Sequence, residues 1–135
     1  MGFKDIAPIR HREESGFISY NNIKLVSIDT SHCTLEVPLS ADTENVWGTA
    51  HGGLIFTLAD TAAGALGRML CSGENLTTDA SIHYYRSTSE SKKLSATSKV
   101  CKLGKNLAFF SVSVEDELHR EIAVAEITMF FVRGH

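Results

Sequence analysis

The sequence predicts an α+β fold in which one long helix packs against an antiparallel sheet. Residues 52–70 form the one long segment free of turn signals, and they have the length of a helix. Segments rich in Thr, Val, Ile, Tyr and Phe precede and follow this helix, as expected of strands. Short turns between consecutive strands imply antiparallel pairing, so the helix must cover one face of the sheet. The 135 residues fit a single domain, 1–135.

Two strands are expected before the helix. Residues 23–28 and 33–37 alternate in hydrophobicity with a period of two, which predicts a hairpin turning at residues 29–31. This alternation puts Ile28 on the face opposite to Leu25. Residues 1–20 form an N-terminal extension, in which a short helix is expected over Ile9 to Phe17.

Four strands are expected after the helix, with turns at residues 104–106 and 115–117. In the first of these turns Lys105 could meet a phosphate, but a plain hairpin turn is the favoured interpretation. The predicted sheet therefore has five to six strands and curves around the helix. Its edges and outer face still need cover, which indicates an oligomer. The four strands span residues 76–86, 94–103, 107–114 and 122–132.

The composition argues against several classes of protein. A net charge of −3 and a pI of 6.0 favour neither nucleic acid nor an anionic membrane as a partner. The cysteines, Cys33, Cys71 and Cys101, are odd in number and lack a C-x-x-C pattern, which suits a reducing cytosol. No two histidines have i,i+4 spacing, so neither a metal nor another cofactor is expected. Without an apolar leader or a run of about 18 apolar residues, we expect a soluble cytoplasmic protein with no membrane segment.

Asp60 is hard to explain in a purely structural helix. Apolar or small residues occupy every side of the helix, which predicts burial nearly all round. Asp60 is the only ionisable residue before Arg68, and aspartate is rarely buried without a partner. A structural interpretation would pair it with a backbone amide or a strand arginine, since Arg68 is about 12 Å away along the helix. The functional interpretation is a catalytic carboxylate.

The segment His51-Gly52-Gly53 lies where the loop meets the helix. The first turn of a helix carries unsatisfied N–H groups and the positive end of the helix dipole. Glycines there let a ligand oxygen approach these amides, as an oxyanion or a polarised carbonyl would. The alternative is that the glycines only permit a tight helix entry or close packing.

Gly52 and Asp60 lie about 12 Å apart along one helix axis, at 1.5 Å per residue. They therefore cannot reach the same carbonyl carbon from one chain. If they cooperate, the Gly52 amide meets Asp60 of a second subunit across two antiparallel helices. An obligate homodimer with composite sites follows as a hypothesis.

The run N-V-W-G-T-A-H-G-G-L-I-F-T-L-A-D, from Asn45 to Asp60, resembles the signature of hotdog-fold thioesterases. It is most similar to the PaaI-like branch of the phenylacetate pathway. The motif H-G-G-x-x-x-x-L-A-D-x-A matches at every fixed position from His51 to Ala62. The resemblance implies a hotdog fold and hydrolysis of an acyl-CoA thioester at the interface of a homodimer, itself part of a homotetramer.

The resemblance also implies roles for individual residues. Asp60 corresponds to the carboxylate that acts as general base on water or as nucleophile. The amide of Gly52 corresponds to the group that polarises the thioester carbonyl. Asn45 corresponds to a residue that helps to position thioester and water, although from its residue type alone it could equally be a loop or helix-entry cap.

Other residues are candidates for supporting roles. Thr77 falls where some members carry a hydroxyl that assists the water, with Thr78 adjacent as the other possibility. His51 could act as a general base, but shaping the loop is its favoured role. The candidate substrate contacts include two aromatic residues for which core packing is the favoured interpretation, Trp47 and Phe56, together with Gly53 and Thr61.

Two other functions compete with thioester hydrolysis. Hotdog hydratases and dehydratases carry a His followed by Pro-Gly, whereas Gly-Gly follows His51 here and the carboxylate comes nine residues later. A non-catalytic acyl-CoA-binding module is the second alternative, and loss of the carboxylate or of the oxyanion loop would favour it. Both features are present. The acyl group is expected to be small to medium or aromatic, and the sequence does not specify which.

Overall fold

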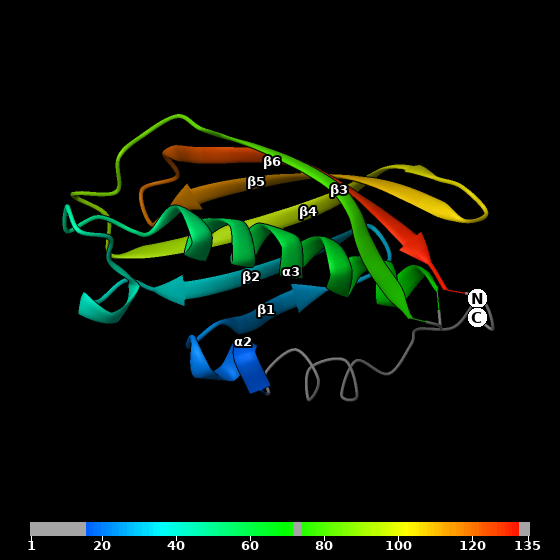
Figure 1. Ribbon diagram of the computed structural model, residues 1–135, viewed down its shortest axis with the longest axis horizontal. Coiled ribbons are helices and arrows are strands. Elements are labelled where there is room, and N and C mark those ends of the chain that lie inside the picture. The colour runs from blue at the N-terminus through cyan, green and yellow to red at the C-terminus, as the bar shows by residue number, and fades with distance from the viewer. Residues whose placement is uncertain (1–15, 72–73, 133–135) are drawn as a thin grey trace.

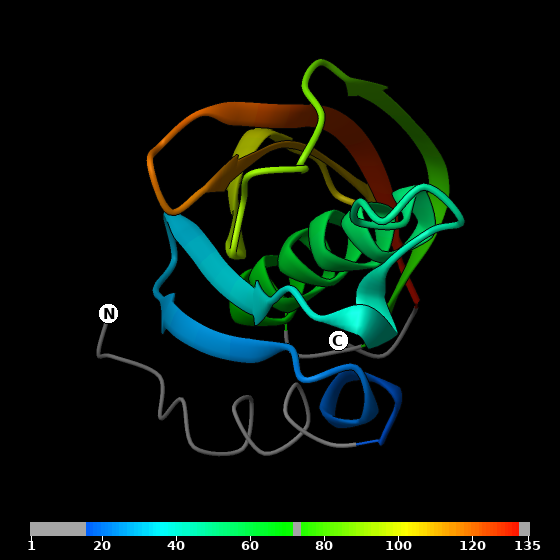
Figure 2. The same cartoon turned by 90° about the vertical axis from the view of Figure 1, so that its left-hand side faces the viewer.

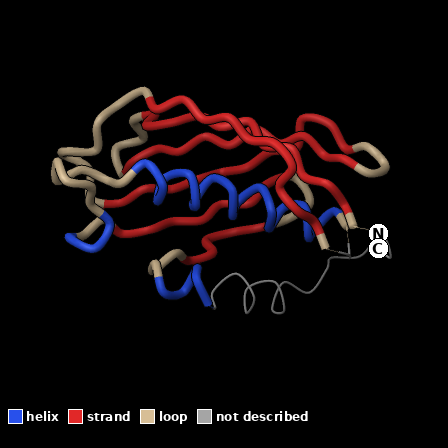
Figure 3. The backbone as a smooth tube through the Cα atoms, in the orientation of Figure 1, coloured by secondary structure: helices blue, strands red, loops and turns tan. Residues whose placement is uncertain are grey.

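The computed structural model describes residues 16–71 and 74–132. The helix expected over Ile9 to Phe17 lies almost wholly outside these residues. Figures 1 and 3 show the elements that follow one another along the described chain: α2 (Gly16–Tyr20), β1 (Lys24–Ile28), β2 (His32–Pro38), the 3₁₀ turn η1 (Ala41–Thr43), α3 (Gly52–Leu70), β3 (Asn75–Tyr84), β4 (Lys93–Leu103), β5 (Leu107–Asp116) and β6 (Glu121–Phe131).

The six strands form one antiparallel sheet in the order β1-β2-β4-β5-β6-β3. Figure 2 shows this sheet curving around α3. The predicted α+β architecture, with one long helix inside a curved sheet, is therefore confirmed. Because β1 and β3 end the strand order, each is paired on one side only among the described residues.

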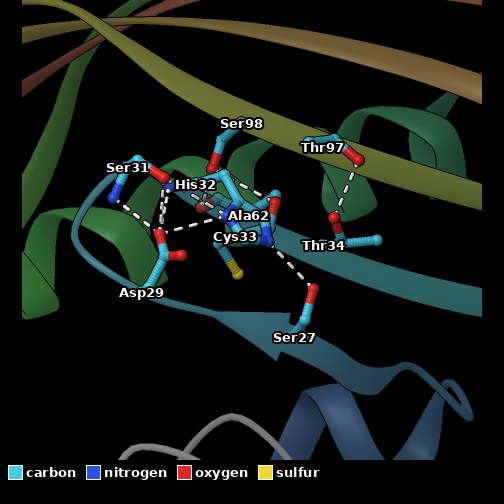
Figure 4. A network of polar contacts seen from close by, with 9 residues as sticks. All are labelled: Ser27, Asp29, Ser31, His32, Cys33, Thr34, Ala62, Thr97 and Ser98. Atoms are coloured by element: carbon cyan, nitrogen blue, oxygen red, sulfur yellow. Dashed lines mark hydrogen bonds and ion pairs between the residues drawn. The ribbon is translucent and has the colours of Figure 1, made fainter.

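The core lies between the concave face of the sheet and α3. Alternate residues of β2, β5, β6 and the first half of β4 point inward and are almost fully buried, because side chains alternate between the two faces of a strand. Residues such as Leu35, Phe110 and Ile127 meet Leu58 and Leu66 of the helix in this core. The buried Ser98 of β4 donates a hydrogen bond to the carbonyl of Ala62 (2.7 Å), which ties α3 to the sheet (Figure 4).

The simple alternation expected for the first strand is wrong at Ile28. The register between β1 and β2 shifts between Leu25 and Ser27, so Val26 is an extra residue in a β-bulge. The bulge moves every later side chain of β1 to the other face. Ile28 is therefore buried with Leu25 rather than exposed with Lys24.

Asp29 organises the turn between β1 and β2 (Figure 4). Its Oδ1 accepts hydrogen bonds from the amides of Ser31 (2.7 Å) and His32 (3.0 Å), and from the Ser31 hydroxyl. The Ser31 hydroxyl and these amides lower the pKa of the Asp29 carboxyl to about 2. The His32 ring continues the network, with Nδ1 at 3.1 Å from Asp29 and Nε2 at 3.0 Å from the Ser27 hydroxyl. The hairpin turn predicted at residues 29–31 is confirmed.

The last turn lies later than predicted. Strand β5 continues to Asp116, and the turn falls between it and Glu121. Asp116 is only 2 % exposed, and its carboxylate accepts hydrogen bonds from the amides of Leu118 and Arg120, the Arg120 guanidinium and the Ser91 hydroxyl. The residue that composition assigns to the turn is thus the buried acceptor that organises it. The other turn, at residues 104–106, is confirmed.

The helix spans the predicted residues but is not buried all round. One stripe at helical spacing stays partly exposed, and we call it the uncovered stripe. The opposite side, with Leu58, Ala62 and Leu66, has no exposure. The sheet of one chain therefore covers only part of α3. The uncovered stripe consists of Gly53, Phe56, Thr57, Asp60, Thr61 and Gly64.

Two further expectations concern membranes and cysteines. None of the helices in the described ranges combines the length and the apolar character needed to cross a membrane. Cys33 and Cys71 are buried, Cys101 is exposed, and none of the three forms a disulfide bond.

Candidate active site

The carboxylate of Asp60 lies beside β3. The Thr77 hydroxyl donates a hydrogen bond of 2.6 Å to Asp60 Oδ1 and also contacts the sulfur of Met129 at 3.4 Å. Asp60 Oδ2 accepts no hydrogen bond from the described residues. The Asp60 side chain is half-buried within one chain. One oxygen of the carboxylate is thus fixed and the other is free to bind water.

A β-bulge in β3 selects Thr77 over Thr78. Thr77 pairs with Met129 and Asp79 pairs with Thr128, so Thr78 has no partner on β6. Thr77 therefore points toward the helix, and Thr78 is the bulged residue. The structure brings together the two residues, Asp60 and Thr77, that the resemblance links.

His51 caps the start of α3. Its Nδ1 accepts a hydrogen bond of 2.8 Å from the amide of Gly53, which satisfies one of the free N–H groups of the first turn. A Cβ atom on Gly53 would lie 3.0 Å from this ring nitrogen. Gly53 thus leaves room for the His51 cap, and His51 shapes the helix entry.

Gly52 is the first residue of α3, and its amide N–H has no acceptor among the described residues. This amide is free to bind a ligand oxygen. The carbonyl of the same residue accepts a hydrogen bond of 2.8 Å from the Tyr84 hydroxyl. Sequence reasoning missed Tyr84, because a tyrosine in a strand carries no signal that it reaches a helix end.

Asn45 closes the tight loop before the helix. Its Oδ1 accepts hydrogen bonds from the amides of Trp47 (2.9 Å) and Thr49 (3.2 Å), and its Nδ2 donates to the Thr49 hydroxyl (2.9 Å). Gly48 completes the loop with a φ of +79°, a conformation that glycine adopts easily. Asn45 thus has the loop-forming role that its residue type allowed.

Trp47 does not pack in the core of the chain, which corrects the favoured interpretation. It is 83 % exposed at the tip of the loop, next to Val46 at 91 %. Phe56 is half-buried rather than enclosed. Three candidate substrate contacts, Gly53, Phe56 and Thr61, lie on the uncovered stripe with Asp60, whereas Trp47 lies apart from them on the loop.

An open groove of 390 Å³ adjoins the start of α3. Its walls come from α2, η1 and the first two turns of α3, including Phe17, Leu54 and Thr57. Two acidic residues, Asp42 and Glu44, and His51 also border it. No group of three or more His, Cys, Asp or Glu side chains in the described part of the chain could hold a metal ion.

The candidate residues therefore form two separate groups on one chain. Asp60 and Thr77 make the first, and Gly52, Tyr84 and His51 make the second at the start of the helix. The groups are about 12 Å apart along the axis of α3. Within a single chain they do not meet.

Comparison with known proteins identifies the family. The sequence profile of the thioesterase superfamily matches residues 48–123, which include the helix and the strands that follow it. The chain therefore belongs to the thioesterase superfamily, and it is a thioester hydrolase.

Solved structures identify the fold as the hotdog fold. A thioesterase from Haemophilus influenzae superposes with a TM-score of 0.87 at 18% identity, over 96% of this chain and 91% of that one. The Escherichia coli PaaI protein of the phenylacetic acid degradation operon gives 0.85 at 20% identity, over 92% and 89%. A Streptococcus mutans protein, solved with bound acetyl-CoA, gives 0.78 at 28% identity, over 84% and 90%.

Proposed function

We propose that this protein hydrolyses a small-to-medium or aromatic acyl-CoA to the free acid and CoA. The resemblance to the PaaI-like branch supports this substrate class, as does the Streptococcus mutans protein solved with acetyl-CoA. In the proposed site, Asp60 acts on water or on the thioester, and the amide of Gly52 stabilises the oxyanion.

The observation that carries the proposal is the hydrogen bond from Thr77 to Asp60. Because the Thr77 hydroxyl donates a hydrogen bond to Oδ1, that oxygen serves as an acceptor and the carboxylate is held in one orientation. Oδ2 accepts no hydrogen bond from the described residues, so its lone pairs stay available. This is the arrangement that a general base or a carboxylate nucleophile requires.

A composite site between two subunits explains how distant groups cooperate. The uncovered stripe of α3 and the unpaired edge of β3 lie on the same side of the chain and need cover. A second copy related by a two-fold axis, with its helix antiparallel, would bring Asp60 of one subunit toward Gly52 of the other. The minimal active unit is then a homodimer.

The chemistry of the site can proceed without a strong nucleophile. Asp60 removes a proton from water, and the resulting hydroxide adds to the thioester carbonyl carbon. The Gly52 N–H stabilises the negative charge that develops on the carbonyl oxygen. The C–S bond then breaks, CoA leaves as a thiolate, and the proton that Asp60 took from water passes to the thiolate, which regenerates the carboxylate. If Asp60 instead attacks the carbonyl, water hydrolyses the resulting anhydride and regenerates the carboxylate.

The cellular setting is part of the proposal. The three cysteines form no disulfide bond, which suits the reducing cytosol, so we propose a cytoplasmic enzyme. A homotetramer built from two such dimers is proposed from the resemblance to the PaaI-like branch.

The first experiment measures thiol release from a panel of acyl-CoAs that includes phenylacetyl-CoA and hydroxybenzoyl-CoA. We expect wild-type turnover, and a fall in kcat of about 10²–10⁴-fold in Asp60→Asn. Asp79→Asn is the matched control, because Asp79 lies on β3, two residues after Thr77, and its side chain is exposed. Full activity in Asp60→Asn would refute the assigned site. Binding of acyl-CoA without turnover would instead favour the non-catalytic binding module.

A complementation experiment tests whether the site is shared between subunits. Asp60→Asn and Gly52→Pro should each be inactive alone, since each damages every site of its own homodimer. A heterodimer of the two would contain one site with both defects and one intact site. Random pairing should therefore restore about a quarter of wild-type activity. If both groups acted within one chain, mixing would restore nothing.

A further inference from the structure

One peptide group at the start of α3 is held at both of its polar atoms. The Tyr84 hydroxyl donates to the carbonyl oxygen of Gly52, at 2.8 Å. The amide of Gly53, in the same peptide group, donates to Nδ1 of His51, also at 2.8 Å. Tyr84 comes from β3 and His51 from the loop before the helix, so two different parts of the chain fix one peptide plane.

These two hydrogen bonds also determine the direction of the neighbouring amide. The N–H of Gly52 belongs to the preceding peptide group, which joins the fixed peptide group at the Cα of Gly52. Glycine allows a wide range of φ and ψ, so without restraint this amide would sample many directions. With the peptide plane fixed on one side and His51 fixed as the helix cap on the other, the free N–H keeps one direction. A preorganised donor stabilises an oxyanion better than a mobile one, because no reorganisation is needed during the reaction.

The Tyr84 ring lies close to Gly52. A Cβ atom on Gly52 would lie 3.4 Å from the Tyr84 hydroxyl oxygen and 3.5 Å from Cζ. Burial raises the pKa of the Tyr84 hydroxyl above its ordinary value of 10.0, so the hydroxyl stays protonated at neutral pH and can donate its hydrogen bond. The carbonyl oxygen of Gly52 has two lone pairs, and it can accept this bond together with its own helical bond.

We propose that Tyr84 is a positioning residue for the oxyanion amide of Gly52. It acts through the Gly52 carbonyl and does not itself touch the substrate. This inference rests on the proposed thioesterase function, because it assigns Tyr84 a part in that same site.

The chain supplies a matched control in the next residue. Tyr85 projects from the opposite side of the backbone, where its ring stacks on His83 at a centroid distance of 6.4 Å. It is 62 % exposed, and its hydroxyl makes no hydrogen bond to the described residues. Tyr85→Phe therefore removes the same atom as Tyr84→Phe, from the same strand end, without touching α3.

The experiment compares steady-state kinetics of wild type, Tyr84→Phe and Tyr85→Phe on the best acyl-CoA of the panel. Losing one positioning hydrogen bond should lower kcat about tenfold in Tyr84→Phe and leave KM within about twofold. Tyr85→Phe should keep wild-type values. Adding His51→Ala to Tyr84→Phe should lower kcat by less than the product of the two single effects, since both side chains hold one peptide group.

The outcomes separate this inference from the function on which it rests. An active wild type with unchanged kcat in Tyr84→Phe would overturn the positioning role and leave the thioesterase assignment intact. A raised KM with unchanged kcat would also overturn it, because that pattern indicates a direct substrate contact. A wild type that hydrolyses no acyl-CoA would overturn the proposed function and this inference together. The predicted fall in kcat at constant KM, with an unaffected Tyr85→Phe, supports it.

Discussion

Thr77 and Tyr84 lie seven positions apart on β3, yet both hydrogen-bond to α3. In a regular strand, residues separated by an odd number of positions point to opposite faces of the sheet. The bulge at Thr78 reverses the alternation between them, so both side chains point toward the helix. One strand thereby reaches Asp60 with its first half and Gly52 with its last residue.

The Thr77 hydroxyl should matter more than the bulk of the side chain. We expect Thr77→Val to lower kcat about tenfold, because Asp60 loses the hydrogen bond that orients it. Thr77→Ser keeps the hydroxyl and should stay within about threefold of wild type by the same reasoning. Thr78→Val, at the bulged neighbour, is the matched control. Equal losses in Thr77→Val and Thr78→Val would contradict a specific role for the hydroxyl.

Gly52→Pro should remove the oxyanion donor while preserving the helix. Proline lacks the N–H, and it is well tolerated at the first position of a helix. His51 already has φ −64° and ψ 135°, the conformation favoured before proline. We expect kcat to fall by about 10²–10³-fold with little change in Tm. Gly52→Ala, which retains the N–H, should lose much less activity, and similar losses in both variants would exclude the amide as the donor.

The His51 cap should contribute measurably to stability. His51→Ala leaves the Gly53 amide without its acceptor and should cost about 1 kcal/mol of unfolding free energy. Asparagine is a good helix cap, so His51→Asn should recover most of that loss. Urea titrations of the three proteins measure the differences. If alanine and asparagine are equally destabilising, the ring is not held in place by its capping bond.

Asp116 should make stability depend on pH in the acid range. Burial by itself raises the pKa of its carboxyl, but hydrogen bonds from the Arg120 amide, the Ser91 hydroxyl, the Arg120 guanidinium and the Leu118 amide outweigh it and lower the pKa to about 2. The folded state thus favours the ionised carboxylate. Its contribution is complete above the ordinary value of 3.8 and is lost as the pH falls through about 2.

The test is the difference in unfolding free energy between wild type and Asp116→Asn. At pH 7 the variant should be less stable by about 1–3 kcal/mol, because buried donors lose a charged acceptor. The difference should shrink steadily between pH 4 and pH 2, as wild-type Asp116 takes up a proton. A difference that stays constant over this range would show that the charge of Asp116 contributes nothing.

Local patterns in the sequence determined the elements and the chemistry. The helix was predicted at residues 52–70 and lies there, because a long segment free of turn signals, with a loop before it and a turn cluster after it, specifies both ends. The inward alternation of β2 followed from its period of two, whereas the four later strands were predicted from their composition. The motif from His51 to Ala62 identified the family, and Asp60 stood out as a lone charge in an apolar helix.

Only the tertiary structure decided which of these residues meet. Bulges at Val26 and Thr78 reverse the alternation of side chains along β1 and β3. The residue types at these positions do not predict a bulge, because a bulge depends on pairing with the neighbouring strand. The same holds for the Tyr84 contact, which depends on β3 crossing the start of α3. The helix, apolar on every side in sequence, keeps an uncovered stripe because the sheet of one chain curves around only part of it. Composition specifies what each residue prefers, and packing in three dimensions specifies its partner.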